Sequence, residues 1–444
     1  MPRLYPDTAY APTPAPSYWQ ATVPDAVPGP SLEGDTTIDT AVIGGGFTGL
    51  NAAIRLAERG EEVVVFDAGY PGWGASGRNG GFVCTGGSKV EYADQIKAHG
   101  EDQTRAFVGW QQASIDHVAD NLNRFGIDAD RHSDGEWLLC HSAKNFAESA
   151  ASAEVERRLG IPVTTYSQPE LDERGMAGPE FHGGYHNGWG FAIHPLKYAH
   201  GLRRAAEGMG VKTYSLSPVT DVQRENGYRL TVNGHTVRAR RLIVAANGYA
   251  KDGWIDWLSG RFLPVVSSIM VTRVLTDDEL AAQGWTTDQA AFDSRALVHY
   301  FRLLPEKRFM FGMRGGSSWG PAAEQRRDKI IRREFNRLFP AWSHVETDHT
   351  WSGLLSLSWS YSQYTGRLGD WPDAWTSFAY HGNGVAMGSY AGKLLADMAL
   401  GDLRQQDLPT IMATPPAKFP MPSLRMAYIK GYYVAWDLKE LLRG

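Results

Sequence analysis

The chain has 444 residues, of which 43% are hydrophobic and 21% are charged, and its formal net charge is −5 at pH 7. These values are those of a globular protein of two or three domains, and they exclude a disordered chain or a basic surface for nucleic acid. No apolar run approaches the roughly 20 residues needed to cross a bilayer, and the first residues lack the pattern of a secretory signal. Cys84 and Cys140 form no metal spacing, which favours a reducing compartment. We therefore expect a soluble, cytoplasmic protein.

A glycine motif follows the proline-rich residues 1–36, which we expect to run extended over the surface. Gly44, Gly46 and Gly49 stand between an apolar run and a helical pattern, and a second apolar run ends in Asp67. Gly44 allows a tight turn, Gly46 lets the backbone approach a pyrophosphate, and Gly49 lets the helix pack on the sheet. The helix N-terminus favours phosphate, and the acid is placed for a ribose. This order predicts a dinucleotide site rather than a chance glycine cluster, and it leaves FAD or NAD open.

Residues 69–83 are too rich in glycine for a regular element. They also contain Trp73, Arg78 and Phe82, which a loose linker would not hold. We interpret them as a loop whose backbone is pressed against a flat ligand, with Ser76 and Arg78 available to phosphate or ring oxygens. A flexible linker is the alternative.

Helical and strand periodicities alternate through the rest of the chain. We expect helices over 90–125, 147–159, 195–210 and 322–339, and strands over 135–141, 228–232, 235–237, 241–249, 263–275, 298–304 and 308–313. The run 241–249 is apolar enough for a buried parallel strand, whereas residues 263–313 suit an antiparallel sheet. A strand, a glycine turn and a helix of small residues over 377–401 place a second helix N-terminus beside a ligand.

The fold class that follows is α/β with an α+β second domain. A discontinuous Rossmann-like domain over residues 37–88, 186–260 and 350–403 binds the dinucleotide. An antiparallel-sheet domain over residues 89–185 and 261–349 holds the substrate. The tail, residues 404–444, is rich in Tyr, Trp and Leu over 426–433 and 434–442, and it clamps onto its own body or onto a neighbouring subunit of an oligomer, rather than onto a membrane.

A single flavin fits this sequence better than a flavin with a nicotinamide. Residues 382–388 have the spacing G-x-G-x-x-x-G, and no strand ending in an acid follows at the expected distance. The chain also lacks the pair of redox cysteines of a flavin disulfide reductase. The second glycine turn is therefore expected to close over the same ligand.

Four stretches in this order resemble the D-amino-acid oxidase and sarcosine oxidase superfamily of FAD proteins: residues 41–50, 72–81, 242–248 and 381–388. Within the superfamily the chain is most similar to the gamma-glutamylputrescine oxidase group, through Ser17-Tyr-Trp19 and the loop of residues 74–81. The resemblance spans residues about 17 to 403. Sarcosine oxidases attach their flavin through a Cys before the last glycine turn, but residues 351–357 contain none. The resemblance therefore implies a non-covalent FAD.

Carried over by position, the resemblance implies that FAD is contacted along its whole length. The diphosphate and ribose contacts fall on Gly44, Gly46, Phe47, Thr48, Gly49, Asp67 and Ala68, and the loop contacts on Gly74, Ala75, Ser76, Arg78, Asn79, Gly80 and Gly81. Val219 would bond adenine, Ala246, Asn247 and Gly248 would lie at the edge of the nucleotide, and Gly382, Asn383, Gly384 and Val385 would lie at the pyrimidine end of the ring. Family members often have Glu where this chain has Asp67.

The resemblance implies oxidation of an amine C–N bond in a gamma-glutamylated or other N-substituted amine. The amine gives a hydride to flavin N5, the imine is hydrolysed, and molecular oxygen is reduced to hydrogen peroxide. An amino-acid dehydrogenase that passes electrons to a quinone or other carrier is the first alternative. A flavin monooxygenase or halogenase is another, although Gly369-Asp370 is wrongly placed for its signal, and FAD bound without turnover is the third.

Two residues are candidates for catalysis or substrate binding. Arg302, on a strand of the substrate sheet, is either a bidentate ligand of a substrate carboxylate or a surface arginine. His381, beside the last glycine turn, either touches flavin or substrate or only packs there. No metal is expected, because the three residues between His182 and His186 include two glycines, and the histidines have no carboxylate or Cys partner nearby. Trp351 and Tyr380 either wall the substrate cavity or pack in the core.

Overall fold

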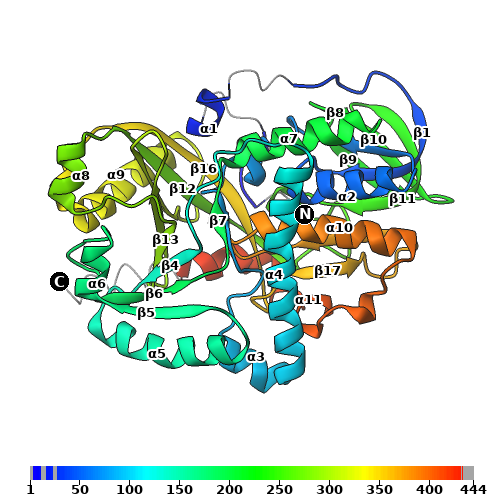
Figure 1. Cartoon of the computed structure of the whole chain (residues 1–444). Helices are drawn as coiled ribbons and strands as arrows, with labels where there is room; N and C mark the ends of the chain where they lie inside the picture. Colours follow the sequence, from blue (N-terminus) through cyan, green and yellow to red (C-terminus); the bar gives the residue numbers. More distant parts are fainter. Residues whose placement is uncertain (1–3, 12–16, 24–27, 432, 434–444) are drawn as a thin grey trace.

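The structure is a computed structural model, and it describes residues 4–11, 17–23, 28–431 and 433. The strands form two large sheets that lie side by side, one in the right half of the molecule and one in the left half in Figure 1. The long helix α4 (Glu101–Arg124) runs between the two halves. The expected α/β class, with a parallel-rich sheet and a largely antiparallel one, is confirmed.

The first sheet has eight strands, and its parallel centre has the order β18-β11-β1-β2-β8. Its strands are β1 (Thr36–Ile43), β2 (Val63–Phe66), β8 (Lys212–Tyr214), β9 (Val219–Arg224), β10 (Tyr228–Val232), β11 (His235–Val244), β17 (Tyr364–Arg367) and β18 (Ala374–Phe378). In β1, Val42 belongs to one buried cluster while Ala41 and Ile43 belong to the other, because side chains alternate across a strand. Both faces of the strand are therefore covered, as its apolar run predicted.

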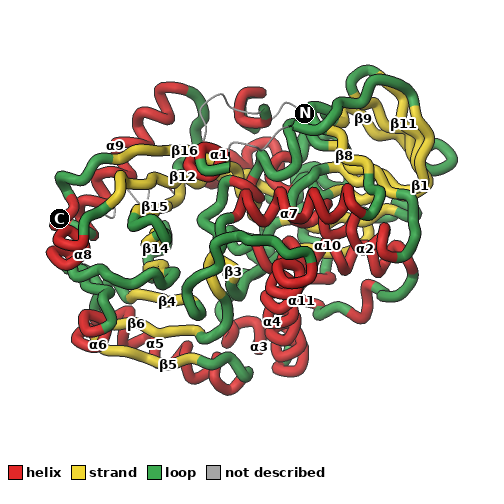
Figure 2. Tube along the Cα trace, turned by 45° about the horizontal axis from the view of Figure 1, so that its top comes forward, coloured by secondary structure: helices red, strands yellow, loops and turns green. Residues whose placement is uncertain are grey.

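Helices α2 (Phe47–Glu58), α7 (Pro195–Gly208) and α10 (Val385–Leu400) cover one face of this sheet (Figure 2). Glycine sets how closely α2 and α10 approach each other. A Cβ atom at Gly392 would lie 2.1 Å from the Thr48 carbonyl oxygen. The helix of small residues therefore brings its N-terminus to the same place as the N-terminus of α2.

The second sheet also has eight strands, in the order β16-β12-β15-β14-β13-β4-β6-β5, and only β13 and β4 pair in parallel. Its strands are β4 (Glu136–Leu139), β5 (Val163–Ser167), β6 (Gly183–Asn187), β12 (Phe262–Val274), β13 (Ala291–Asp293), β14 (His299–Leu303), β15 (Arg308–Arg314) and β16 (Thr347–Ser358). Aromatic side chains from β14, β15 and α9 (Pro321–Leu338) pack on one face of it. The opposite face is free to line a cavity.

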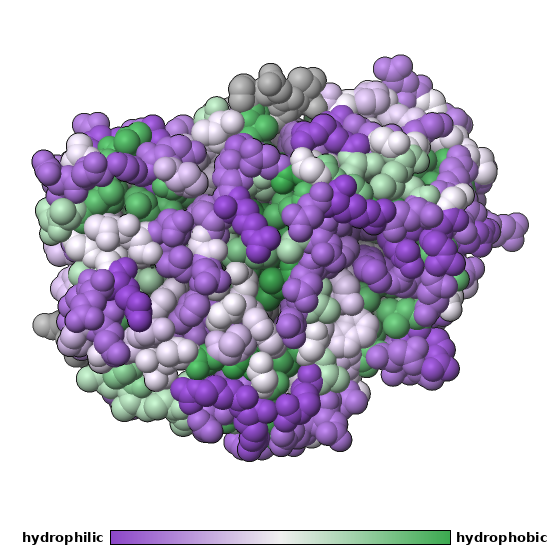
Figure 3. Space-filling model, viewed as in Figure 1, coloured by the Kyte–Doolittle hydropathy of each residue, from purple (hydrophilic) through white to green (hydrophobic). Residues whose placement is uncertain are grey.

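The remaining elements are short or peripheral. They are α1 (Tyr18–Ala21), α3 (Tyr92–His99), α5 (Ala143–Arg158), α6 (Gln168–Glu173), α8 (Asp277–Gln283), α11 (Thr410–Ala413) and the small ladder of β3 (Phe82–Val83) with β7 (Phe191–Ala192). Within the described residues, no helix is long and apolar enough to span a membrane. The outer surface in Figure 3 is mostly hydrophilic, and hydrophobic residues show in the seam between the two halves.

Three expected elements differ in the structure. The single helix expected over 90–125 is two helices, because Gly100 between them has a φ of 85°. The strands expected over 235–237 and 241–249 are one strand, β11, whose residues 238 and 240 face solvent. Strand β16 pairs along its length with β12, so it belongs to the second sheet and not to the nucleotide domain expected from residue 350. The expected domain boundaries otherwise stay predictions.

The described part of residues 1–36, which was expected to run extended over the surface, is anchored by buried aromatic side chains. Tyr5, Tyr10 and Trp19 are buried, and the Trp19 indole donates a hydrogen bond of 2.9 Å to the Asn79 carbonyl. A capping box at Ser17 begins the short helix that carries Trp19. The burial of these aromatic side chains was not predicted, because the segment is rich in proline and has few periodic apolar positions.

The described part of the C-terminal tail packs on its own chain. Phe419 and Ile429 pack against Leu263 and Val265 of β12, and Arg425 is fully buried. The expected contact of the tail also included residues 432 and 434–442. These residues, and the rest of 434–444, lie outside the described residues.

Arg425→Met should lower the free energy of unfolding by about 3 kcal/mol. The Arg425 guanidinium lies 2.8 Å from the Asp252 carboxylate, which is also buried, and the substitution leaves that carboxylate without its counter-ion. Urea unfolding followed by tryptophan fluorescence measures the change. Arg404→Met is the matched control, because its pair with Asp407 is exposed, and equal losses in the two variants would contradict the prediction.

Candidate active site

One cavity of about 330 Å³ runs between the two sheets. At one end it is lined by the residues that follow β1 and β2, and at the other end by one face of the second sheet. The turn before α10 also lines it. The cavity therefore joins the glycine motif to the second sheet.

The glycine motif forms a close turn at the first end. Gly44 has a φ of 103°, and a Cβ atom there would lie 2.8 Å from the Ala245 carbonyl oxygen. A Cβ at Gly46, the N-cap of α2, would lie 2.7 Å from the Ser76 hydroxyl. A Cβ at Gly49 would lie 1.9 Å from the Gly44 carbonyl oxygen. Only glycine fits these positions, which is the requirement of a cradle for phosphate.

Asp67 lies directly after β2 and lines the cavity. The Gly45 and Gly69 amides donate hydrogen bonds of 2.6 Å and 2.8 Å to its two carboxylate oxygens. Desolvation by burial raises the pKa of this carboxyl to about 6. The Trp73 side chain is a third hydrogen-bond partner. A carboxylate has about four acceptor sites, so this one is oriented and still keeps a site for a ribose hydroxyl.

The glycine-rich loop is held rigid by its own polar groups. The Asn79 amide donates to the Ala75 and Ser76 carbonyls and accepts from the Gly81 amide. The Arg78 guanidinium donates to the carbonyls of Trp73 and, at 3.2 Å, Ser352. These bonds turn the side chains of the loop inward and leave its backbone along the cavity, which favours a ligand loop over a flexible linker.

The last glycine turn brings a second helix N-terminus to the cavity. Gly384 is the N-cap of α10, and Gly382 in the turn has a φ of 102°. His381 lines the cavity but is almost completely buried, and the Ser358 amide donates to its Nε2 at 3.3 Å. Desolvation lowers the pKa of His381 to about 3, so the ring is neutral at ordinary pH. The contact orders the turn, and a catalytic role for His381 stays a prediction.

The far end of the cavity is built on one face of the second sheet. Tyr300 pairs with Gly312, and a Cβ at Gly312 would lie 2.2 Å from the Tyr300 ring, so this glycine makes room for the ring. The Tyr300 hydroxyl lies 3.0 Å from the Ser267 hydroxyl, and Ser267 pairs with Arg314. Phe292 faces the cavity from the neighbouring strand. The chamber thus has aromatic walls with a guanidinium at its edge.

Three charged side chains line this chamber: Lys89, Glu136 and Arg314. Within the described residues the Lys89 ammonium and the Arg314 guanidinium have no ion pair, and the Cys84 thiol is the partner of Glu136. Desolvation raises the pKa of Glu136 to about 7 and lowers that of Lys89. The two cations, which have no ion pair among the described residues, are an arrangement that suits a ligand with a carboxylate.

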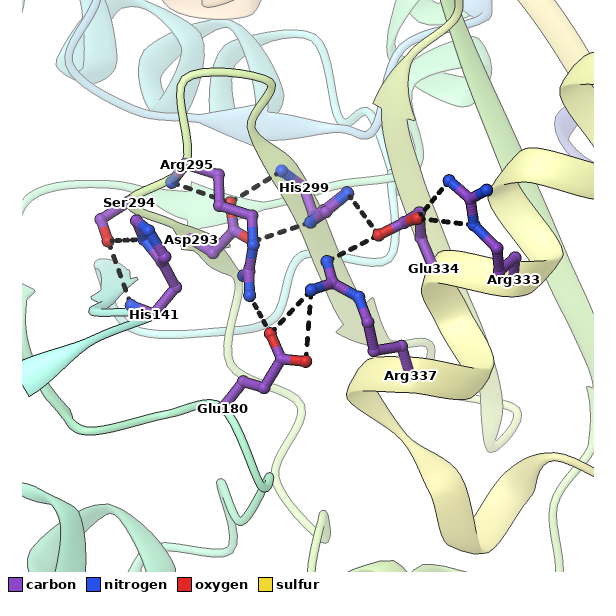
Figure 4. A network of polar contacts seen from close by, with 9 residues as sticks. All are labelled: His141, Glu180, Asp293, Ser294, Arg295, His299, Arg333, Glu334 and Arg337. Atoms are coloured by element: carbon purple, nitrogen blue, oxygen red, sulfur yellow. Dashed lines mark hydrogen bonds and ion pairs between the residues drawn. The ribbon is translucent and has the colours of Figure 1, made fainter. Parts of the chain in front are cut away.

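A network of charges lies behind the chamber wall (Figure 4). The Asp293 carboxylate accepts from the His299 amide at 2.9 Å and lies 2.7 Å from its Nδ1, and it also pairs with Arg295. Arg337 of α9 joins Glu180 and Glu334 to the same network. Because side chains alternate along strands, these groups face away from the cavity that Phe292 and Tyr300 line. The network fixes the wall from behind.

Most of the expected cofactor residues line this one cavity. They are Gly44, Gly46, Phe47, Thr48, Asp67, Ala68, Gly74, Ala75, Ser76, Arg78, Asn79, Gly80, Val219, Ala246, Asn247, Gly382, Asn383, Gly384 and Val385. Gly49, Gly81 and Gly248 are absent from its lining. They lie where chain segments cross closely, because a Cβ on any of them would lie 2.9 Å or less from a carbonyl oxygen. Tyr380 also lines the cavity, whereas Trp351 packs against Trp19 in the core.

Arg302 does not line the cavity, and its full burial excludes the alternative of a surface arginine, whereas a role as ligand of a substrate carboxylate stays a prediction. Its guanidinium is fully buried and donates to the Ile193 carbonyl at 2.7 Å and to His132 at 2.9 Å. It lies two residues beyond Tyr300 on β14, where the loop at Gly81 covers it. Arg314 of β15 lines the chamber.

Several lining residues were missed from the sequence: Tyr10, Lys89, Glu136, Lys251, Trp254, Ser267, Ile269, Phe292, Tyr300 and Arg314. Tyr300 and Arg314 lie on two strands of an expected hairpin, but the sequence spacing does not predict the register between these strands. Glu136, an acid at the start of an apolar strand, was the clearest available signal.

Comparison with known proteins gives a family match over most of the chain. The family model described as "DAO: FAD dependent oxidoreductase" matches residues 39–398. The gamma-glutamylputrescine oxidoreductase of Escherichia coli (strain K12) is 29% identical over 88% of this chain and 90% of its own length. A probable oxidoreductase OrdL of Rhizobium meliloti (strain 1021) is 31% identical over 89% of this chain and 91% of its own.

Solved structures share the fold at lower identity. Glycine oxidase from Geobacillus kaustophilus superposes with a TM-score of 0.67 at 20% identity, over 82% of this chain and 95% of that one. L-proline dehydrogenase from P. horikoshii gives a TM-score of 0.68 at 17% identity, over 87% and 98%. At these identities the likeness describes the arrangement of the two sheets and not the reaction.

Proposed function

Since this chain belongs to the family of FAD-dependent oxidoreductases described as DAO, we propose that it oxidises the C–N bond of an amine that also carries a carboxylate. A gamma-glutamylated or other N-substituted amine is the substrate class. Hydrogen peroxide, formed from molecular oxygen, is the second product. The observation that carries the proposal is the single cavity that leads from a dinucleotide cradle to a chamber with unpaired cations.

The residues present fit FAD. The close turn at Gly44 and Gly46, the oriented Asp67 carboxylate and two helix N-termini lie on one cavity, and each suits one part of a dinucleotide. Bound FAD supplies the acceptor for the hydride that leaves the carbon next to the nitrogen. The chain itself binds, orients and desolvates the amine.

The chamber favours a carboxylate over a second ammonium. Arg314 and Lys89 offer two positive charges, and Glu136 is at most partly ionised near pH 7. A guanidinium binds a carboxylate through two parallel hydrogen bonds, which fixes the direction of the substrate. The aromatic wall of Phe292 and Tyr300 excludes water from the amine and so lowers its pKa towards the reactive neutral form.

The experiment compares two acceptors across one panel of substrates. Peroxide release under air and dye reduction under argon are measured with gamma-glutamyl amines, N-methyl amino acids, amino acids and polyamines. We expect peroxide release with a carboxylate-bearing amine and weak or no reaction with bare polyamines. Dye reduction without peroxide would support an amino-acid dehydrogenase that uses a quinone or other carrier, and no bleaching of the flavin by any amine would contradict turnover.

All the yellow colour should leave the protein on acid precipitation, because we propose that FAD is held without a covalent bond. Residues 351–357 contain no Cys, and neither Cys84 nor Cys140 lines the cavity. Absorbance at the flavin band is measured in supernatant and pellet. Colour that stays in the pellet after washing in urea would contradict the prediction.

Some substrates carry a second amine besides the one that is oxidised. If that second amine stays protonated, the substrate should bind more tightly as the pH rises through about 7. Burial raises the pKa of Glu136, so its carboxyl is neutral below that value and attracts the ammonium only above it. Glu136→Gln should remove this rise, as measured by the change in flavin absorbance on titration with substrate. Glu156→Gln is the matched control, because burial also raises the pKa of Glu156 to about 7 while its side chain lies outside the cavity. A rise that persists in the Glu136 variant would refute the assignment.

A further inference from the structure

Arg302 carries a buried positive charge without a close counter-ion. Its side chain is fully buried, and no carboxylate of the described residues forms an ion pair with it. Its two direct partners, the Ile193 carbonyl and the His132 ring, are both uncharged, because desolvation lowers the pKa of His132 to about 4. Its Nε has no hydrogen-bond partner in the described chain.

The nearest acids do not neutralise this guanidinium. Glu306, Asp130 and Asp288 act on it from a distance, and Asp130 is already paired with Lys197 at 2.6 Å. Trp19 and Phe82 face it with their rings, with centroids 5.7 Å and 5.9 Å away. An unpaired charge in such surroundings is costly, and proteins retain one where a ligand or a reaction uses it.

The guanidinium of Arg302 lies directly behind the glycine-rich loop of residues 69–83. A Cβ atom placed on Gly81 would be 2.6 Å from one terminal nitrogen of Arg302. Gly80, the preceding residue, lines the cavity, and so does Tyr300, two residues before Arg302 on β14. One thickness of backbone therefore separates the guanidinium from the part of the cavity where the glycine loop meets the chamber.

We propose that Arg302 is an electrostatic positioning residue that makes the potential at the flavin ring more positive and so favours negative charge on the reduced ring. This inference rests on the FAD of the proposed function, but it requires no particular substrate. A fixed charge in a site of low dielectric acts over several ångströms without any reorganisation. The single glycine backbone at residue 81 lets it lie that close.

Sulfite titration of the oxidised holoprotein measures this effect without substrate. Sulfite adds to flavin N5 through its sulfur and leaves its negative charge on the ring system, so its dissociation constant reports the local potential. Arg302→Gln should raise that constant about tenfold, because Gln still donates to Ile193 but carries no charge. Arg302→Lys, which keeps the charge, should stay within about threefold of the wild type.

A second pair of variants leaves Arg302 in place. His132→Glu sets a carboxylate beside the guanidinium and neutralises it, and His132→Gln is the uncharged control. The first should raise the sulfite dissociation constant and lower the midpoint potential, and the second should change neither. The flavin band of the wild-type protein is recorded first. If that band is absent, the proposed function fails, and this result is distinct from any difference between the variants.

The proposal is overturned if the neutral and charged variants hold FAD and bind sulfite equally. Arg302 would then only pack between Trp19 and the loop. If Arg302→Gln does not fold, the two His132 variants decide the matter, and equal sulfite binding by them overturns the proposal in the same way.

Discussion

Arg314→Gln should lower kcat/KM for a carboxylate-bearing amine about 100-fold, mainly by raising KM. The guanidinium of Arg314 lines the chamber and has no partner in the described chain, so the substrate carboxylate would lose its main ligand. Steady-state kinetics measure the change. For the same amine without its carboxylate, the variant should have nearly the wild-type kcat/KM, since that substrate makes no such contact.

The control for this variant lies on the same strand. Arg308→Gln removes a guanidinium of β15 that pairs with Asp348 outside the cavity, so kcat/KM should stay near the wild-type value. If Arg314→Gln lowered kcat/KM by the same factor for substrates with and without a carboxylate, the assignment would be contradicted. In that case Arg314 would shape the chamber without binding the carboxylate.

Gly49→Ala should weaken FAD binding about 100-fold and give a largely colourless protein. The added Cβ would lie 1.9 Å from the Gly44 carbonyl oxygen, so either the turn or the start of α2 has to move. The movement spoils the position of the helix N-terminus relative to the phosphates. The flavin content after purification and the dissociation constant of added FAD measure the loss.

Gly109→Ala provides the matched control for the glycine motif. It also lies within a helix, and a Cβ there meets nothing within 4 Å. Alanine is the better helix former, so this variant should keep its FAD and be slightly more stable. A yellow Gly49 variant with unchanged affinity would show that the turn tolerates the displacement.

The residues expected to hold the nucleotide could be picked out from the sequence because their signals are local. The turn at Gly44, the helix at Phe47 and the acid at Asp67 follow each other within one βαβ unit, and each has a steric or electrostatic requirement. The second glycine turn at 382–385 was predicted for the same reason. All of these reach one cavity in the structure.

The substrate half was harder to predict because it depends on register between distant strands. Arg302 and Tyr300 lie on the same face of β14 by spacing, yet only Tyr300 lines the cavity. The loop that covers Arg302 comes from residue 81, and no local pattern links the two. Lys89 and Glu136 likewise come from distant segments, because Lys89 follows the isolated bridge of Ser88 with Ser362 and Glu136 begins β4. The buried Trp19 was hidden within a proline-rich segment.

Strand β16 has a mechanical consequence for the enzyme. It pairs with β12 in the second sheet, but its residues also bond to the first half, through the Ser352 carbonyl to Arg78, the Leu354 amide to Tyr249 and the Ser358 amide to His381. A hinge motion of one half against the other would break all three bonds at once. We therefore expect the two halves to move together, and ligands to enter and leave through local movements of segments at the rim of the cavity.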